Sequence, residues 1–155
     1  MSRALEIDGE PPIHYDAVIS LSISAQTITP ETITSALGME PKTTHRRGDT
    51  TRRLPSGRVV PRRPAPENFW TRTLLEFTNP PGDLPAELDK LLDQLEHART
   101  LFDAVRDDGG KVEFFIGYFM RASNTGDNFT APLLARLAAF GIGLNFDIYD
   151  PGERR

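Results

Sequence analysis

The residues with the clearest chemical potential are arginines that gather in one stretch of the chain. Residues 42–63 hold eight cations and a single acid, Asp49, so this segment carries a charge of +7. The whole chain carries −4, which leaves −11 for the other residues. A guanidinium group can bind a carboxylate or a phosphate through two parallel hydrogen bonds. We therefore predict a partner-binding surface formed by Arg46, Arg47, Arg52, Arg53, Arg58, Arg62 and Arg63.

Several partners could meet this arginine segment. An acidic patch on another protein is favoured, because a few bidentate arginine contacts around an apolar centre suffice for binding. Nucleic acid is disfavoured, because residues 42–68 contain no Phe, Tyr or Trp to stack on bases and the rest of the chain is acidic. A small anionic ligand is a further possibility, and a solvated loop without any partner is the plainest interpretation.

The residue types that usually perform catalysis do not form a recognisable constellation. His14, His45 and His97 are far apart in the sequence, and no cluster is spaced to hold a metal ion. Asp147 and Asp150 could form a carboxylate pair, although alternation on a solvated strand explains Asp147 without any chemistry. No nucleophile elbow, phosphate-binding loop or dinucleotide fingerprint follows a predicted strand. We expect neither a catalytic site nor a cofactor or metal, and keep an enzyme of unrecognised type as an alternative.

Length and composition indicate one globular domain. The chain has 155 residues, of which 38% are hydrophobic, and it contains no cysteine. The lack of cysteine excludes disulfides and thiol catalysis and fits a reducing compartment. No apolar run approaches the roughly 18 residues that cross a bilayer, and acids interrupt the first residues where a signal peptide would be apolar. We therefore expect a cytoplasmic protein without membrane contact.

Four stretches show the two-residue alternation of half-buried strands, namely residues 15–24, 69–78, 112–121 and 144–150. Strands of a doubly wound parallel sheet are covered on both faces and are continuously apolar. Here Ser20, Ser22 and Asn145 give two of the strands a polar face. The pattern thus predicts an α+β fold with a mixed or antiparallel sheet of four to five strands.

Three helices are predicted between these strands, packed mainly on one face of the sheet. The first begins at Thr29-Pro30 and ends at Gly38, and the third begins at Thr130 and ends at Gly141. Between them, one long helix that begins near Asp83 and Pro85 and ends before Gly109-Gly110 would span on the order of 36 Å. The similar starts and ends of the first and third helices suggest two β-α-β halves in a modified ferredoxin-like arrangement, although chance explains this similarity equally well.

The domain boundaries and the core follow from these elements. We predict an N-terminal tail at residues 1–13, a single domain at 14–150 with an exposed arginine-rich loop at 42–66, and a C-terminal tail at 151–155. Residues 54–58 should form a hairpin tip within the loop. Trp70 is predicted to pack at the edge of the sheet. The predicted core consists of Ile19, Leu21, Ile23, Leu91, Leu95, Phe114, Ile116, Leu137, Phe146 and Ile148.

A spaced combination of short motifs resembles a known family. Pro41-Lys42-Thr43, Gly48-Asp49, Trp70 and the closing Asp147-Ile148-Tyr149 are similar to the bacterial domain-of-unknown-function family numbered 4279. The resemblance covers roughly residues 15–150 and implies a small stand-alone bacterial domain in the cytoplasm. That family has no assigned reaction, so no catalytic role transfers to any residue. Its pattern also has a shorter and less arginine-rich loop than residues 50–66 here.

We therefore interpret the sequence as a non-enzymatic protein-interaction or regulatory module. An immunity-type role is one form of this interpretation and rests on analogy. A nucleic-acid or anion binder is the main alternative. The sequence does not indicate an oligomeric state.

Overall fold

Strand β1 (Tyr15–Ala25) is the middle strand of the sheet, and its alternating side chains separate two faces. The computed structural model describes residues 14–152. Ile19, Leu21 and Ile23 are fully buried on one face, whereas Ser20 and Ser22 lie half-buried on the other. The alternation that the sequence predicts is therefore the feature that orients the whole sheet.

The main sheet is mixed and has the strand order β2-β5-β1-β6-β7. All neighbouring strands are antiparallel except β6 and β7, which are parallel. This confirms the predicted α+β class and mixed sheet. The remaining bounds are β2 Thr43–His45, β5 Asn68–Asn79, β6 Lys111–Met120 and β7 Ile142–Tyr149.

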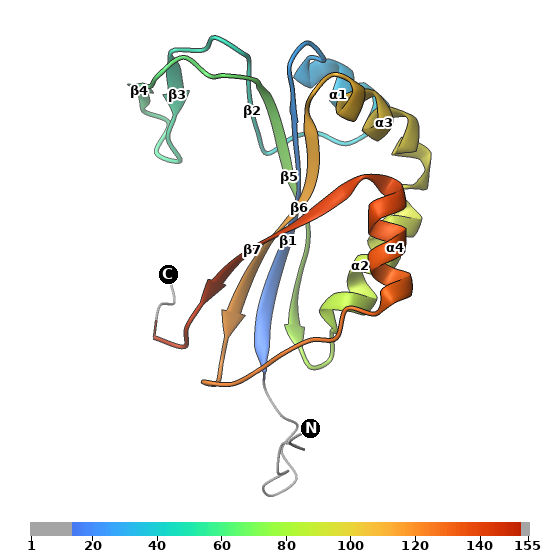
Figure 1. Ribbon diagram of the computed structural model, residues 1–155. Coiled ribbons are helices and arrows are strands. Elements are labelled where there is room, and N and C mark those ends of the chain that lie inside the picture. The colour runs from blue at the N-terminus through green and yellow to red at the C-terminus, as the bar shows by residue number, and fades with distance from the viewer. Residues whose placement is uncertain (1–13, 153–155) are drawn as a thin grey trace, which may run out of the picture.

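The four α-helices of residues 14–152 lie on one face of this sheet and leave the opposite face open (Figure 1). Thr29 and Thr130 cap the first and last helices, which end at Gly38 and Gly141 in the left-handed conformation, as predicted. The helices are α1 Pro30–Leu37, α2 Leu84–Gln94, α3 Arg99–Asp107 and α4 Ala131–Phe140, with a 3₁₀ turn at Glu96–Ala98.

The prediction of a single long helix is wrong, because the 3₁₀ turn separates α2 from α3. The imidazole Nδ1 of His97 lies 3.1 Å from the Gln94 carbonyl, which an unbroken α-helix would pair with the Ala98 N–H. The Ala98 N–H instead donates to the Leu95 carbonyl at 2.9 Å. The other ring nitrogen, Nε2, lies 3.1 Å from the Leu37 carbonyl. His97 thus holds the break against the end of α1.

The ferredoxin-like description fits only loosely. Strands β6 and β7 form a β-α-β unit in which the two strands are adjacent and parallel. In the other half, β5 lies between β1 and β2 and is antiparallel to both. The two halves therefore differ in strand order. The strands on either side of α4 are neighbours in the sheet, whereas β5 separates the strands on either side of α1.

One core unites the helices and the sheet, and eight of the ten predicted core residues are buried in it. Phe146 and Ile148 are the exceptions, with exposed fractions of 37% and 59%. Strand β7 pairs with a neighbour on one side only. Its eight residues span about 26 Å, whereas the ten residues of α4 span about 15 Å, so the helix covers only the first part of the strand.

Trp70 also differs from its prediction, because it lies in the core instead of at an edge. Its side chain is fully buried, and its indole N–H donates to the Thr34 hydroxyl of α1 at 3.0 Å. The short strand β2 pairs outside β5 and moves the edge of the sheet away from Trp70. A three-residue strand leaves too little alternation in the sequence to be recognised.

The predicted tail at residues 1–13 lies outside the described residues, as do residues 153–155. The first two residues of the predicted C-terminal tail, 151 and 152, form a turn. Within the described part of the chain, no helix has both the length and the apolarity needed to cross a membrane.

Candidate functional site

The predicted arginine-rich loop contains three short strands. Strand β2 joins the main sheet, and β3 (Thr51–Arg53) pairs with β4 (Val59–Pro61) in a separate antiparallel ribbon. At the predicted tip, the Leu54 N–H donates to the Arg58 carbonyl and the Gly57 N–H donates to the Leu54 carbonyl, each at 2.8 Å. We call residues 46–65 the arginine hairpin. It projects from the sheet on the side opposite the helices (Figure 1).

A buried asparagine anchors the base of the arginine hairpin. The Arg47 N–H donates to the side-chain oxygen of Asn68 at 2.8 Å, and the Asn68 amide donates to the Ile28 carbonyl at 2.9 Å. The Gly48 N–H donates to the Ala65 carbonyl and the Ala65 N–H donates to the Asp49 carbonyl, which closes the base between its two strands. Hydrogen bonds of Asn68 therefore hold the base of the arginine hairpin to β5, and hold β5 to residue 28.

The segment that carries Ile28 is itself held by Asp108, at the end of α3. One carboxylate oxygen of Asp108 accepts hydrogen bonds from the backbone N–H groups of Gln26 and Thr27 at 2.8 Å and of Ile28 at 3.2 Å. Hydrogen bonds from the Thr27 hydroxyl and these N–H groups lower the pKa of Asp108 to about 2. The helical layer thus connects to the base of the arginine hairpin through residues 26–28.

His45 joins strand β2 to the arginine hairpin. Its ring stacks on Phe69 with the ring centroids 5.1 Å apart, and its Nδ1 lies 3.4 Å from a guanidinium nitrogen of Arg62. Burial lowers the pKa of His45, and the positive charge of Arg62 lowers it further. A neutral imidazole can accept a hydrogen bond from Arg62, which explains how this cation is held so close to the ring.

The seven predicted arginines have different partners. Arg46 forms an ion pair with Glu31 at 2.7 Å, and Arg53 donates to the Gly57 carbonyl at 2.9 Å. Arg62 is half-buried, whereas the other six are exposed. Within residues 14–152, four guanidinium groups have neither an ion pair nor a hydrogen bond, and they belong to Arg47, Arg52, Arg58 and Arg63.

A groove separates strand β2 from the tip of the arginine hairpin. It has a volume of about 510 Å³ and is lined by Lys42, Thr43, Thr44, Arg53, Leu54 and Pro55. Two of these side chains are cations and none is an acid. The groove can therefore accept an anionic group beside a small apolar surface.

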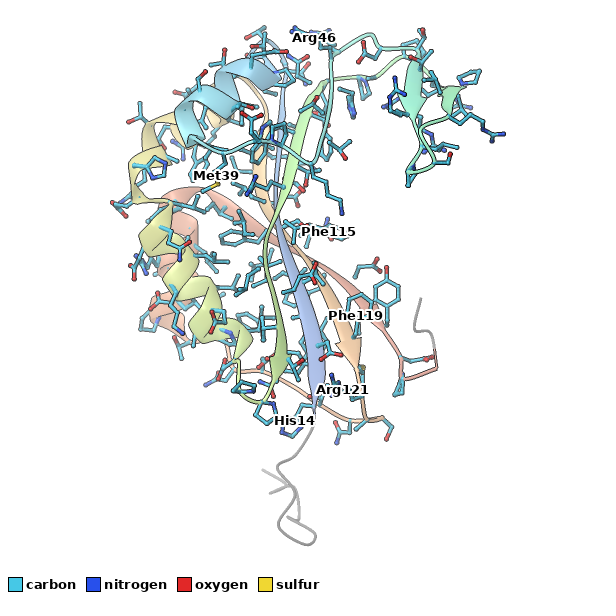
Figure 2. All side chains as sticks on the ribbon, turned by 180° about the vertical axis from the view of Figure 1, so that it is seen from behind. His14, Met39, Arg46, Phe115, Phe119 and Arg121 are labelled. Atoms are coloured by element: carbon cyan, nitrogen blue, oxygen red, sulfur yellow. The ribbon has the colours of Figure 1, made fainter. Side chains whose placement is uncertain are left out.

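The open face of the sheet lies next to the arginine hairpin and carries aromatic side chains. Phe115 and Phe119 project from β6 away from the helices (Figure 2). Phe119 stacks on Tyr149 with ring centroids 4.7 Å apart, whereas Phe115 is 40% exposed. At the far end of this face, Arg121 forms an ion pair with Asp16 at 2.5 Å.

A second cluster, not predicted from the sequence, lies on the helical face. The hydroxyl groups of Tyr15 and Tyr118 donate to the two carboxylate oxygens of Asp127, each at 3.0 Å, and the two tyrosine rings stack with centroids 4.2 Å apart. Tyr15 and Asp127 are 112 positions apart in the sequence. The only sequence signal was the strand alternation that places both tyrosines on the apolar face.

Burial controls the protonation of this tyrosine–aspartate cluster. It raises the pKa of Asp127, against the opposing effect of the two tyrosine hydrogen bonds. Burial also raises the pKa values of Tyr15 and Tyr118 well above their ordinary value. Beside the carboxylate is a surface pocket of about 200 Å³, which Tyr118, Phe129, Phe146 and Ile148 help to line. The exposed second half of β7 therefore forms one wall of the pocket.

The structure does not assemble the other residues considered for chemistry. The described histidines lie before β1, in β2 and in the 3₁₀ turn. Asp147 accepts a hydrogen bond from the Tyr149 hydroxyl, whereas Asp150 accepts one from the Gly152 N–H at 2.8 Å, so the two carboxylates have separate partners. Over residues 14–152, no group of three or more His, Asp or Glu side chains is arranged to hold a metal ion.

The fold and these sites define a small α+β domain with helices on one face of a mixed sheet and a basic hairpin beside the open face. The chain belongs to the family described as a domain of unknown function (DUF4279), whose model matches residues 14–151. The resemblance found in the sequence is thereby confirmed. Searches of curated proteins and of solved structures found no match.

We predict that Asn68, and not the arginines, stabilises the arginine hairpin. Asn68→Ala leaves the Arg47 N–H and the Ile28 carbonyl without their partner in two partly buried hydrogen bonds, and the loss of both should lower the free energy of unfolding by about 1–3 kcal/mol in total. Arg52→Glu and Arg53→Glu should each change it by about 0.5 kcal/mol or less. Urea unfolding measures both effects, with Asn145→Ala on the exposed face of β7 as the control. A larger loss from the arginine variants would contradict the prediction.

A second prediction concerns the pH dependence that Asp127 contributes. Because its pKa is raised, the folded protein keeps a proton that the unfolded chain has already lost, so stability falls as pH rises through this window. Asp127→Asn removes the titrating group. The free energy of unfolding of the wild type minus that of the variant should therefore be larger at pH 4 than at pH 7. Equal differences in urea unfolding at both pH values would show that the carboxyl group titrates normally.

Proposed function

We propose that this domain is a non-enzymatic protein-interaction module that binds an acidic surface of another protein through the arginine hairpin. The observation that carries the proposal is the group of four unpaired guanidinium groups on a hairpin whose base is held by hydrogen bonds. Such groups have lost little freedom to internal contacts and remain available for bidentate binding of carboxylates.

The cations on the helices provide a contrast that supports this proposal. Arg99 pairs with Glu96 at 3.3 Å, and Arg106 pairs with Asp103 at 3.0 Å. Arg136 pairs with both Asp89 and Asp93 and lies over the ring of Phe140. Positive charge on the helical side is therefore neutralised locally. On the arginine hairpin only Arg46 forms an ion pair, so most of the positive charge there is available to an external partner.

The surface around these arginines suits a protein partner. Val59 on the arginine hairpin is 51% exposed and offers an apolar contact. The groove between β2 and the hairpin tip adds Lys42 and Arg53 beside Leu54 and Pro55. An apolar centre with cations around it matches the usual anatomy of protein interfaces, in which arginine is enriched.

A single-stranded nucleic acid is the second candidate, because Phe115 and Phe119 lie on the open face below the arginine hairpin (Figure 2). Open sheet faces with aromatic residues can stack bases. The same face, however, includes Glu76, Glu113 and Asp147, which would repel a phosphate backbone. Phe119 also already stacks on Tyr149. The protein partner is therefore the better-supported proposal.

The wider role we propose is regulatory. A cytoplasmic setting fits the lack of cysteine, and an immunity-type function, in which the domain binds and restrains an acidic partner, is consistent with exposed cations on a small domain. Neither point depends on a catalytic group. The proposal excludes enzymatic activity as the main function.

The test is capture of partners from the native host with two charge-matched variants. One variant replaces Arg52, Arg58 and Arg63 by Gln, and the control replaces Lys90, Arg99 and Arg106, which are paired on the helices. The wild type and the control should recover the same protein, which the first variant should lose. A photo-crosslinking residue in place of Val59 should join that protein to the arginine hairpin.

Titration with a single-stranded oligothymidylate tests the second candidate. A backbone contact with six to eight phosphates would give a slope of log affinity against log salt of roughly −4 to −6 on a single strand. We expect no such slope. A steep slope, or equal recovery of the same proteins by both arginine variants, would contradict the proposed function.

A further inference from the structure

We propose that the pocket beside Asp127 binds a small organic ammonium group, with the carboxylate as its counter-ion and the surrounding aromatic rings as its cage. The pocket is lined by residues from the C-terminal halves of β6 and β7 and from the segment that leads from β6 to α4. It is on the helical face of the sheet and is lined by none of the arginine hairpin. The proposal is therefore independent of the proposed function.

Hydrogen bonds from two tyrosines make the carboxylate of Asp127 a hydrogen-bond acceptor. The Tyr15 hydroxyl accepts from the Leu84 N–H at 2.9 Å and from the Asn79 amide at 3.2 Å. Both of its lone pairs are then occupied, so its proton must point to Asp127. Tyr118 donates to the other carboxylate oxygen. Asp127 is thus held as an acceptor by two phenols.

The carboxylate keeps the capacity to accept from a ligand. A carboxylate has about four acceptor positions, and the two tyrosines use one on each oxygen. Among residues 14–152, no lysine or arginine forms an ion pair with Asp127. Asp127 is half-buried and is one of the residues that line the pocket, so an amine bound there would lie beside it. A cation bound here would form charge-assisted hydrogen bonds with the remaining positions.

The walls of the pocket favour a cation over other ligands. The ring of Phe146 meets Tyr118 edge to face at 6.3 Å and meets Phe129 edge to face at 5.9 Å, and all three aromatic residues line the pocket. Aromatic faces attract ammonium groups, and their attraction is strongest where water is partly excluded. An anionic ligand would instead be repelled by Asp127.

The size of the pocket limits the ligand. Its volume of about 200 Å³ is below the roughly 300–1,000 Å³ typical of sites for drug-sized molecules. The apolar lining by Met120, Phe146 and Ile148 can cover a short hydrocarbon or one ring. A primary or methylated amine with such a substituent fits both the volume and the charge.

The experiment uses benzylammonium as the probe and benzyl alcohol and benzoate as matched neutral and anionic compounds. Amide chemical shifts of the full-length protein are recorded while each compound is added. Benzylammonium should shift signals of residues around Asp127 and should bind at least tenfold more tightly than either control compound. Because this comparison uses the wild type alone, it tests the proposal even if a variant fails to fold.

Two variants locate the interaction. Asp127→Asn, which is close in shape but uncharged, should weaken binding of benzylammonium at least tenfold, and Phe146→Ala should weaken it severalfold. Asp147→Asn, on the neighbouring strand but on the open face, should leave binding unchanged. Equal binding of benzyl alcohol, shifts centred on other acidic surfaces, or absence of binding at 20 mM benzylammonium would each overturn the proposal.

Discussion

The side chain of Asn68 connects the two parts of this molecule that differ most in character. It is buried at the start of β5, and its side-chain oxygen and nitrogen bind two different backbone segments. One segment begins the arginine hairpin, and the other is the turn held by Asp108 at the end of α3. A buried amide must satisfy its donors and acceptors, so these contacts fix where the arginine hairpin leaves the sheet. The position of the arginine hairpin therefore depends on this junction.

The molecule uses charge differently on its two sides. On the helices, cations lie three residues from acids or bind across to a neighbouring helix, so they contribute to the surface of a stable layer. The arginine hairpin holds seven arginines and one acid, Asp49, and among these arginines only Arg46 forms an ion pair, with Glu31 of α1. Mutual repulsion among these cations costs stability, which the backbone hydrogen bonds at the base offset. An acidic partner would relieve that repulsion, which is why we place the function on this side.

Local patterns made the elements predictable, whereas contacts between distant residues did not. Alternation identified the long strands, and Thr29 with Gly38 and Thr130 with Gly141 marked the helix ends. The break between α2 and α3 near His97 depends on the carbonyl of Leu37, sixty positions away, so no local pattern in the sequence predicts it. Alternation also shows to which side Phe146 points but not whether a helix covers it.

The candidate sites also differ in whether they depend on local sequence or on contacts between distant residues. The arginines are contiguous in the sequence, so their gathering was visible there, but which of them are paired depends on the folded structure. The tyrosine–aspartate cluster joins Tyr15 to Asp127, 112 positions away, and could not be predicted from spacing. Family membership adds no assignment, since the family is described only as a domain of unknown function.

The central claim is that the arginine segment is a hairpin held in place before any partner binds, and amide hydrogen exchange of the free protein tests it most directly. The N–H groups of Arg62 and Ala65 donate to the carbonyls of Thr50 and Asp49 at 2.8 and 2.9 Å. We predict that both exchange at least tenfold more slowly than in an unstructured chain, and that Asn68→Ala removes much of this protection. Exchange of both groups at the rate of an unstructured chain in the wild type would show a mobile, solvated loop and would contradict the account.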